Sequence, residues 1–239
     1  MNYAIIAAGE GSRLVQEGVS KPKPLVEIDG EPMIQRLINI FLRCRAESVS
    51  VIVNEQMTEV REFLEHMELP VPLNIVVKST PSSMHSFAEL TRVIPPGKFI
   101  LTTVDTIFDE HDFDMYVRHW EDTSDRSGLW AVTTYIDDEK PLYVDVGSTG
   151  SVVAFRDGPS DHDLYVSAGI YGMTERFFPI VRECVERGES RMRNFQRAAL
   201  NAPMMRLGAH EMLKKVIDVD HASDIAKAEE LLYNAKLDN

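Results

Sequence analysis

The stretch from Ala7 to Leu25 constrains this chain more than any other part of it. An apolar run, Tyr3 to Ala8, ends there at Gly9 and predicts a buried strand that stops at a turn. Because Gly9 and Gly11 carry no Cβ, the backbone N–H groups of this turn can approach a ligand closely. Cations follow at Arg13, Lys21 and Lys23. Exposed amides beside fixed cations suit a polyphosphate ligand.

Two common phosphate-binding loops do not fit this stretch. A dinucleotide fingerprint, G-x-G-x-x-G, would need its third glycine where Leu14 stands. A P-loop, G-x-x-x-x-G-K followed by Ser or Thr, occurs nowhere in the chain. A surface turn with scattered charges is the plain alternative. The combination of an apolar strand, spaced glycines, an arginine and a Pro-Lys pair argues against it.

The stretch instead resembles the signature of the sugar-phosphate nucleotidylyltransferases, which is roughly A-A-G-x-G-x-R, a spacer and P-K-x-L. The matching segments are Ala7-Ala8-Gly9-Glu10-Gly11-Ser12-Arg13-Leu14 and Lys21-Pro22-Lys23-Pro24-Leu25, continued by Val26 to Ile34. This resemblance implies that the nucleotide binds at Ala7, Ala8, Gly9, Glu10, Gly11 and Ser12. It also implies two catalytic cations: Arg13 on the leaving pyrophosphate, and Lys23 on the α-phosphate and the attacking phosphate.

The chain as a whole is acidic, with a formal net charge of -13 over 239 residues. Such a field repels nucleic acid and anionic membranes, so we expect neither as a partner. An anionic substrate must then be captured by local cations, which gives the cluster around Arg13 more weight. Cys44 and Cys184 have no metal-site spacing and predict buried free thiols. With no signal-peptide pattern and no apolar run of membrane-spanning length, we expect a cytoplasmic protein.

Apolar strands alternate with amphipathic helices, which predicts an α/β fold. With the resemblance, we expect a three-layer α/β/α, Rossmann-like (GT-A type) fold with a mixed, mostly parallel sheet. We expect a single domain over residues 1–239, with a nucleotide half at about 1–110 and an acceptor and second metal-ligand half at about 111–239. A small β-hairpin is expected from Tyr143–Val146 and Ser151–Phe155. Other expected strands include Ser48–Val53, Leu73–Val77, Lys98–Thr103, Gly128–Ile136, Tyr165–Gly172, Met204–Leu207 and Lys215–Val219. Expected helices are Glu31–Ala46, Thr58–Met67, Phe87–Ile94, Asp112–Thr123, Thr174–Arg187 and Arg191–Leu200.

The polar loop from Ser79 to Ser86 lies between an expected strand and an expected helix. Such loops lie at the carboxyl ends of strands, where α/β proteins bind ligands. The nucleotidylyltransferases hold the base and ribose in the corresponding loop, and Ser82, Ser83 and Met84 resemble it in the phosphocholine-type branch of the family. These residues are therefore expected to bind the nucleotide. A serine-rich helix cap fits the same residues equally well.

Asp105 is a candidate magnesium ligand. It follows an expected buried strand, where a carboxylate is costly unless it is solvated, paired or bound to metal. In the family an aspartate at this place, usually in a Gly-Asp pair, ligates magnesium. Val104 replaces that glycine here.

The end of the chain resembles the closing motif of the family, a strand with an acidic residue before a Thr-Pro-Glu-Asp-Leu type helix start. Asp218 occupies the place of the second metal ligand, and His221-Ala222 replaces the usual Thr-Pro. Asp220 lies two residues further on, so on an extended strand it would face the same side and join the metal site. Asp220 or Ser223 serves nearly as well as a cap for the final helix.

The segment from Tyr165 to Gly172 resembles the family strand that passes beneath the sugar or alcohol. On this basis the acceptor-binding residues are Ser167, Gly169, Ile170 and Tyr171. A glycine inside an apolar strand indicates either a close approach to the backbone or a β-bulge. The Glu-Lys-Pro of hexose-1-phosphate members is replaced by Arg156-Asp157-Gly158-Pro159, in which Arg156 is either a phosphate partner or a solvated loop cation. The run Asp161-His162-Asp163 fits a hydrated loop better than a metal site.

Together these residues predict a nucleotidyltransferase with Mg²⁺ held between Asp105 and Asp218. It would move a nucleoside monophosphate from a nucleoside triphosphate to a sugar-1-phosphate or phospho-alcohol and release pyrophosphate. The attacking phosphate monoester has a second pKa of about 6, so it needs no general base. A GT-A type glycosyltransferase and a non-catalytic nucleotide-binding module are the alternatives. The sequence leaves open the base, the acceptor and whether the chain forms a homo-oligomer.

Overall fold

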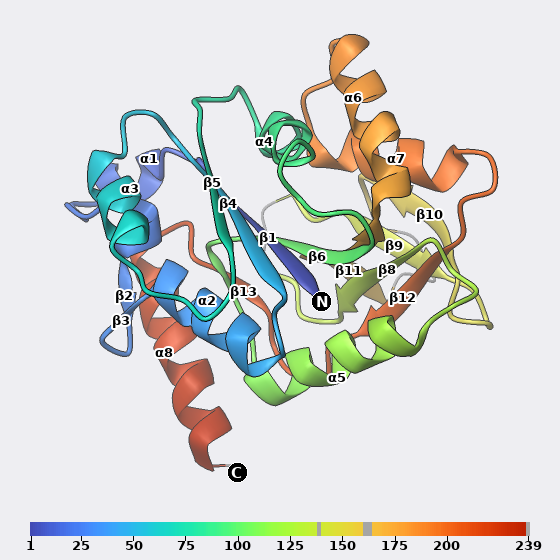
Figure 1. Ribbon diagram of the computed structural model, residues 1–239. Coiled ribbons are helices and arrows are strands. Elements are labelled where there is room, and N and C mark those ends of the chain that lie inside the picture. Colours follow the sequence, from blue (N-terminus) through green and yellow to red (C-terminus); the bar gives the residue numbers. More distant parts are fainter. Residues whose placement is uncertain (138–139, 160–163, 238–239) are drawn as a thin grey trace.

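A nine-stranded mixed β-sheet crosses the molecule, and helices cover both of its faces (Figure 1). The computed structural model describes residues 1–137, 140–159 and 164–237. Its strands are β1 Asn2–Ala7, β2 Glu27–Ile28, β3 Glu31–Pro32, β4 Ser48–Val53, β5 Leu73–Val77, β6 Lys98–Thr103, β7 Thr106–Ile107, β8 Gly128–Thr133, β9 Tyr143–Val146, β10 Val152–Arg156, β11 Tyr165–Thr174, β12 Leu207–Glu211 and β13 Ile217–Asp218. Its helices are α1 Ser12–Gln16, α2 Met33–Arg43, α3 Thr58–Glu65, α4 Ser83–Leu90, α5 Glu110–Asp122, α6 Phe178–Glu186, α7 Met192–Asn201 and α8 Ala222–Leu237, with short 3-10 turns at Lys23–Leu25 and Glu175–Phe177.

The sheet has the order β10-β9-β11-β6-β1-β4-β5, and β8 and β12 extend it from β11. β1 lies between β4 and β6 and pairs with both in parallel. β11 pairs antiparallel with β6, β8 and β9, and β10 pairs antiparallel with β9. In strand direction, β10 and β11 therefore run against the rest of the sheet. The expected mixed, mostly parallel sheet is confirmed.

Two apolar cores lie on opposite faces of the sheet and explain why β1 is apolar from Tyr3 to Ala7. Tyr3, Ile5 and Ala7 point into one core, with side chains from α2, α3, α5 and α8. Ala4 and Ile6 point into the other, with side chains from α4, α6 and α7. A strand that is buried on both faces needs apolar residues at every position, not at alternate ones. Figure 1 shows the resulting three layers, which confirm the expected α/β/α arrangement.

Several elements begin and end where the sequence pattern predicts. β4, β5, β6 and β9 have the expected bounds, because each is a short apolar run bounded by polar or turn residues. β9 and β10 pair antiparallel, as expected of a hairpin, with a register shift between Val152 and Ala154. Both cysteines are buried free thiols, and burial raises the pKa of Cys44 to about 12 and that of Cys184 to about 11.

Two expected elements are displaced. The helix expected from Phe87 begins at Ser83, because the Ser82 side chain accepts a hydrogen bond from the His85 N–H and caps a polar first turn. Apolar periodicity cannot detect such a turn. The strand expected at Met204–Leu207 is wrong: Met204 has a φ of 66°, in the left-handed region, and β12 begins only at Leu207. Across the described ranges, no helix has the length and apolar character needed to cross a membrane.

A histidine pair joins α5 to β12. His119 Nδ1 lies 2.8 Å from His210 Nδ1, while His210 Nε2 is buried without a hydrogen-bond partner in the described part of the chain. A buried N–H without an acceptor is costly, so we assign the proton of neutral His210 to Nδ1, which donates to His119. A second proton would have to sit on the buried Nε2. Burial and then His119 lower the pKa of His210, against the opposing effects of Asp112 and Glu211.

This pair predicts a pH dependence of stability. The pKa of His210 is lower in the folded chain than in the unfolded chain, where it is about 6.5. Below that pH the unfolded chain binds a proton that the folded chain does not, so His210 disfavours folding as the pH falls. We expect His210→Phe to lose less stability than the wild type between about pH 7.5 and 5.5 in urea unfolding, because phenylalanine cannot bind that proton. His111→Phe, at an exposed site on α5, is the control. If His210→Phe lost as much stability as the wild type over this pH range, the assignment would be contradicted.

Candidate active site

The glycine turn after β1 packs directly on Lys23. Gly11 has a φ of 62°, in the left-handed region that favours glycine, and α1 begins at the next residue. A Cβ on Gly11 would lie only 2.9 Å from the Cβ of Lys23. Gly9 differs, because a Cβ there would meet nothing within 4 Å. Gly11 thus lets the turn lie against Lys23, and Gly9 leaves space at the tip of the strand.

Lys23 joins three segments that are distant in the sequence. Its side chain is only 8% exposed, and its Nζ forms ion pairs with Asp105 and, at 2.7 Å, with Asp220 Oδ1. Arg13 donates to the other oxygen of Asp220 at 3.0 Å. Burial alone would lower the pKa of Lys23, but Asp105 and Asp220 outweigh it and raise that pKa. Burial likewise opposes ionisation of Asp220, but Lys23 and Arg13 lower its pKa. Lys23 and Asp220 are therefore charged in the free protein.

A short strand pair brings the chain end to the Asp105 turn. β13 pairs antiparallel with β7, which places Asp218 opposite Thr106, and the Val219 N–H donates to the Asp105 carbonyl at 3.0 Å. Asp218 is open to the cleft, yet desolvation by the surrounding protein, followed by repulsion from Asp105, raises its pKa above the usual range. β13 ends at Asp218, so Asp220 lies just beyond the strand, but both carboxylates line the same cleft, as the sequence predicts. Beyond β13 the Asp220 N–H donates to the Asp218 carbonyl at 3.1 Å, and the Asp220 carboxylate contacts Arg13 and Lys23.

A cleft of about 710 Å³ opens between the glycine turn, the loop before α4 and these carboxylates. The expected site residues that line it are Ala8, Gly9, Glu10, Gly11, Ser12, Arg13, Lys23, Ser82, Ser83, Asp105, Asp218 and Asp220. Ser82 both caps α4 and lines this cleft, so the two interpretations of that loop are compatible. Ala7 and Met84 do not line it, because their side chains are buried in the cores on either face of the sheet. Thr80, Ser86 and Thr103 add hydroxyl groups to the lining.

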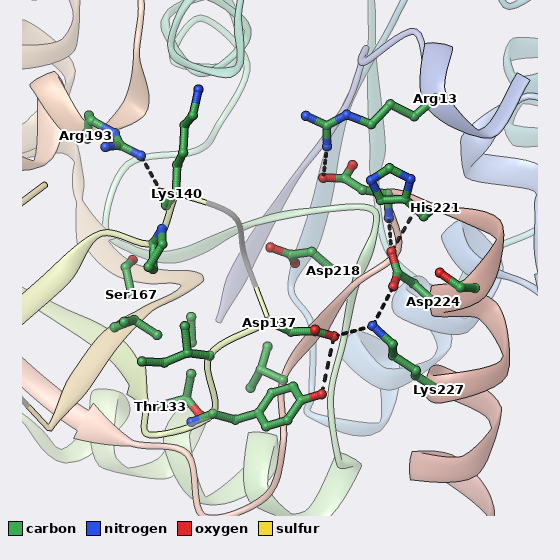
Figure 2. A pocket seen from close by; sticks show the side chains of 18 residues that line it. Arg13, Thr133, Asp137, Lys140, Ser167, Arg193, Asp218, His221, Asp224 and Lys227 are labelled. Atoms are coloured by element: carbon green, nitrogen blue, oxygen red, sulfur yellow. Dashed lines mark hydrogen bonds and ion pairs between the residues drawn. The ribbon is translucent and has the colours of Figure 1, made fainter. Parts of the chain in front are cut away.

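A second cavity of about 440 Å³ adjoins the first (Figure 2). Arg13, Asp218 and Asp220 line both. Lys140 and Arg193 lie across this second cavity from Arg13, with Asp218 between them (Figure 2). The two spaces therefore adjoin at Arg13, Asp218 and Asp220.

The strand expected to bind the acceptor lies along this second cavity, but its four expected acceptor-binding residues do not all line it. Ser167 lines the cavity, and Gly169 and Tyr171 line an adjoining hollow of about 470 Å³. Ile170 is fully buried in the core and contacts neither, because successive side chains of a strand point to opposite faces. Gly169 has a φ of 72° where the register of β11 with β8 shifts, so the β-bulge interpretation is confirmed.

Sequence reasoning missed several charged residues of the second cavity. Arg193 donates to Asp157 at 2.6 Å and to the Lys140 carbonyl at 2.8 Å, which fixes its guanidinium at the cavity wall. On the opposite wall, Lys227 of α8 bridges Asp137 and Asp224. The detectable signals were the Arg191-x-Arg193 pair at the start of a helix and the charges after β8. Arg156, the residue weighed instead, pairs with Asp145 on the hairpin and does not line the cavity.

The carboxylates of the cleft suit a hard cation. Asp105 and Asp218 offer oxygen donors, and a cation there would relieve the repulsion that raises the pKa of Asp218. Within residues 1–137, 140–159 and 164–237, no three His, Cys, Asp or Glu side chains gather as a metal cluster. Further ligands would therefore come from substrate phosphates and water. The run Asp161-His162-Asp163 lies outside the described residues.

A family model describes most of this chain. The MobA-like NTP transferase domain matches residues 3–200. The chain belongs to that family. The match includes the glycine turn, Lys23, Asp105 and β11, and it ends before Asp218. The MobA-like assignment thus agrees with the resemblance found in the signature stretch.

Curated relatives of this MobA-like domain are similar over part of their length. The 2-aminoethylphosphonate cytidylyltransferase of Lancefieldella rimae is 29% identical over 117 residues, which cover 47% of this chain and 46% of the relative. The bifunctional protein GlmU of Methanococcus maripaludis is 23% identical over 194 residues, which cover 79% of this chain and 44% of that protein. The aligned region thus spans less than half the length of either relative.

Solved structures share the fold along nearly the whole chain. The inositol-1-phosphate CTP transferase from T. maritima superposes with a TM-score of 0.82 at 19% sequence identity, covering 98% of this chain and 96% of its own. HddC from Yersinia pseudotuberculosis gives a TM-score of 0.72 at 17% identity, covering 97% and 99%. At these identities the likeness establishes the architecture.

The buried position of Lys23 predicts a stability difference between two neighbouring lysines. Lys23→Met keeps the apolar stem but leaves Asp105 and Asp220 without their shared cation. We expect this variant to lower the free energy of unfolding by about 3–5 kcal/mol, nearer the lower value because Asp220 is nearly half exposed. Lys21 pairs with Glu27 at the surface, so Lys21→Met should cost less than about 1 kcal/mol. Urea unfolding at neutral pH compares them, and equal losses would show that the Lys23 pairs do not stabilise the fold.

Proposed function

We propose that this protein transfers a nucleoside monophosphate from a nucleoside triphosphate to the phosphate or phosphonate of a small sugar or alcohol, releasing pyrophosphate. One observation carries the proposal: Arg13, Asp218 and Asp220 line both the 710 Å³ cleft and the 440 Å³ cavity. Two substrates bound in these spaces would meet at this junction. A transfer reaction needs that arrangement, because it joins two reactants in one orientation.

In this proposal the chain itself supplies binding and charge. The amides of the Gly9 to Ser12 turn bind the triphosphate, Arg13 contacts the leaving pyrophosphate, and Lys23 contacts the α-phosphate. Lys140 and Arg193 hold the anionic end of the acceptor from the opposite wall. On binding, phosphate oxygens replace Asp220 as partners of Arg13 and Lys23. Catalysis is then positioning and neutralisation of charge, as in other phosphoryl-type transfers.

No general base is needed for this reaction. A phosphate monoester has a second pKa of about 6, so at neutral pH the attacking oxygen is already largely ionised. The raised pKa of Asp218 does not make it the base, since its carboxylate oxygens have the hard-donor chemistry of a magnesium site. Asp105 and Asp218 would hold the magnesium ion, and Asp220 lines the same cleft. When bound, magnesium would offset negative charge on the transferred phosphate.

The substrates we would test first follow from the relatives. The protein from L. rimae is named a 2-aminoethylphosphonate cytidylyltransferase, which favours CTP and a small phosphonate or phospho-alcohol. The wall of the second cavity suits a small polar substrate, because Lys227, Asp137 and Tyr135 offer hydrogen-bond donors and acceptors side by side. A common hexose-1-phosphate is less favoured, since Arg156-Asp157-Gly158-Pro159 stands where the hexose members carry Glu-Lys-Pro after the hairpin, and the Glu139-Lys140-Pro141 of this chain lies before β9.

The direct test is a pyrophosphate-release screen. Each of the four common nucleoside triphosphates is combined with sugar-1-phosphates, phosphocholine, phosphoethanolamine and 2-aminoethylphosphonate, with and without magnesium. We expect release that needs magnesium and depends on both substrates. A glycosyltransferase would instead use a nucleotide sugar and release no pyrophosphate. A regulatory module would bind a triphosphate without turnover, and either result would overturn the proposal.

Arg13 allows a sharper test of the same site. Its side chain is 55% exposed and pairs with the nearly half-exposed Asp220, so its loss should cost the fold little. Arg13→Ala should nevertheless lower turnover about a hundredfold or more, the loss typical of one charge-stabilising group. Arg61→Ala removes an equally exposed arginine of α3 and serves as the control. Normal pyrophosphate release by Arg13→Ala would remove Arg13 from the reaction.

A further inference from the structure

Glu17 connects the signature turn to the start of the last helix. It follows α1, four residues after Arg13. One of its carboxylate oxygens lies 2.7 Å from His221 Nδ1, and the other accepts from the Ala222 N–H at 2.6 Å. These contacts join residues 204 and 205 positions apart in the chain. Glu17 itself lines neither the nucleotide cleft nor the acceptor cavity.

The way α8 begins explains why a distant residue is used. His221 precedes the first helical residue, where serine, threonine or aspartate usually accepts from the helix N–H groups. The His221 ring turns to Glu17 instead, and Asp224 reaches back to accept from the His221 N–H at 2.8 Å. Glu17 then satisfies the next N–H, that of Ala222. The signature turn thus supplies a cap that the local sequence does not.

This cap lies next to a contact that substrate binding would break. Arg13, one turn before Glu17, pairs with Asp220, one residue before His221. In the proposed reaction phosphate replaces Asp220 as the partner of Arg13, so that direct link between α1 and the carboxylate segment is lost. The Glu17 contacts use the His221 ring, which lines the acceptor cavity, and the Ala222 N–H, and the proposed reaction assigns neither group to a substrate phosphate. They are able to persist when the Arg13 pair opens.

We propose that Glu17 is a positioning residue, which holds the Arg13 turn and the Asp218–Asp220 segment in register through His221 and the Ala222 N–H. This inference rests on the proposed function, because register matters only if both segments act on one transferred phosphate. Glu17 and His221 are each 39% exposed, and an ion pair at that exposure contributes little to stability. The effect of Glu17 should therefore appear in turnover more than in unfolding.

Three variants test this role. Glu17→Ala removes both contacts, whereas Glu17→Gln keeps an oxygen for the Ala222 N–H and an amide N–H for His221 Nδ1. Glu65→Gln alters a comparably exposed glutamate of α3, which pairs with Arg61 of the same helix, and is the control. We expect Glu17→Ala to lower kcat about tenfold, with a much smaller change in the KM for the triphosphate, because misalignment acts on the reacting geometry. Glu17→Gln should restore most of kcat, and Glu65→Gln should match the wild type.

A second measurement needs no turnover. Hydrogen–deuterium exchange of the free protein should be faster at the start of α8 in Glu17→Ala than in the wild type, and near normal in Glu17→Gln. A fall in melting temperature with unchanged kcat would overturn the positioning role. So would a loss of kcat in Glu17→Gln as large as that in Glu17→Ala. If the wild type releases no pyrophosphate with any substrate, the proposed function fails, while the exchange result still decides whether Glu17 caps α8.

Discussion

The buried ammonium group of Lys23 is the contact on which the architecture of the site depends. It lies between Asp105, after β6, and Asp220, before α8, and the glycine turn after β1 packs against its stem. Three segments from the beginning, middle and end of the chain therefore meet at one charge. The parallel strands β1 and β6 bring two of them to one edge of the sheet, and the β7–β13 pair brings the third.

These charges are paired with one another in the free protein, although the chain as a whole is strongly acidic. Arg13 and Lys23 hold Asp220, and Lys23 also holds Asp105. Buried charges without partners are costly, so a site built to bind phosphate needs internal partners while it is empty of substrate. In the proposed reaction, phosphate oxygens take the place of the Asp220 carboxylate, and a cation takes the place of Lys23 beside the other carboxylates. Substrate binding is then an exchange of ion pairs.

The sequence predicted the sheet and the signature well, because both are local patterns. A strand buried on two faces is a short apolar run, and the glycine turn has a fixed spacing. The sequence predicted the contacts of individual side chains less well. Ala7, Met84 and Ile170 belong to motifs that reach the site, but strand and helix geometry turns their side chains into the cores. Arg193 and Lys227 come from segments without a recognisable motif, and Lys140 belongs to a Glu-Lys-Pro that precedes the hairpin. Only the folded chain brings the three to one cavity. Glu17 was hidden for the same reason, since its partners lie at the other end of the chain.

In the proposed reaction, triphosphate binding exchanges the internal ion pairs of this site. A crystal structure of the protein with a non-hydrolysable CTP analogue and magnesium would show this exchange. We expect Arg13 and Lys23 within hydrogen-bond distance of phosphate oxygens, with the Arg13–Asp220 pair broken and the Glu17–Ala222 contact intact. A triphosphate bound elsewhere, with Arg13 and Lys23 still paired to Asp220, would contradict it.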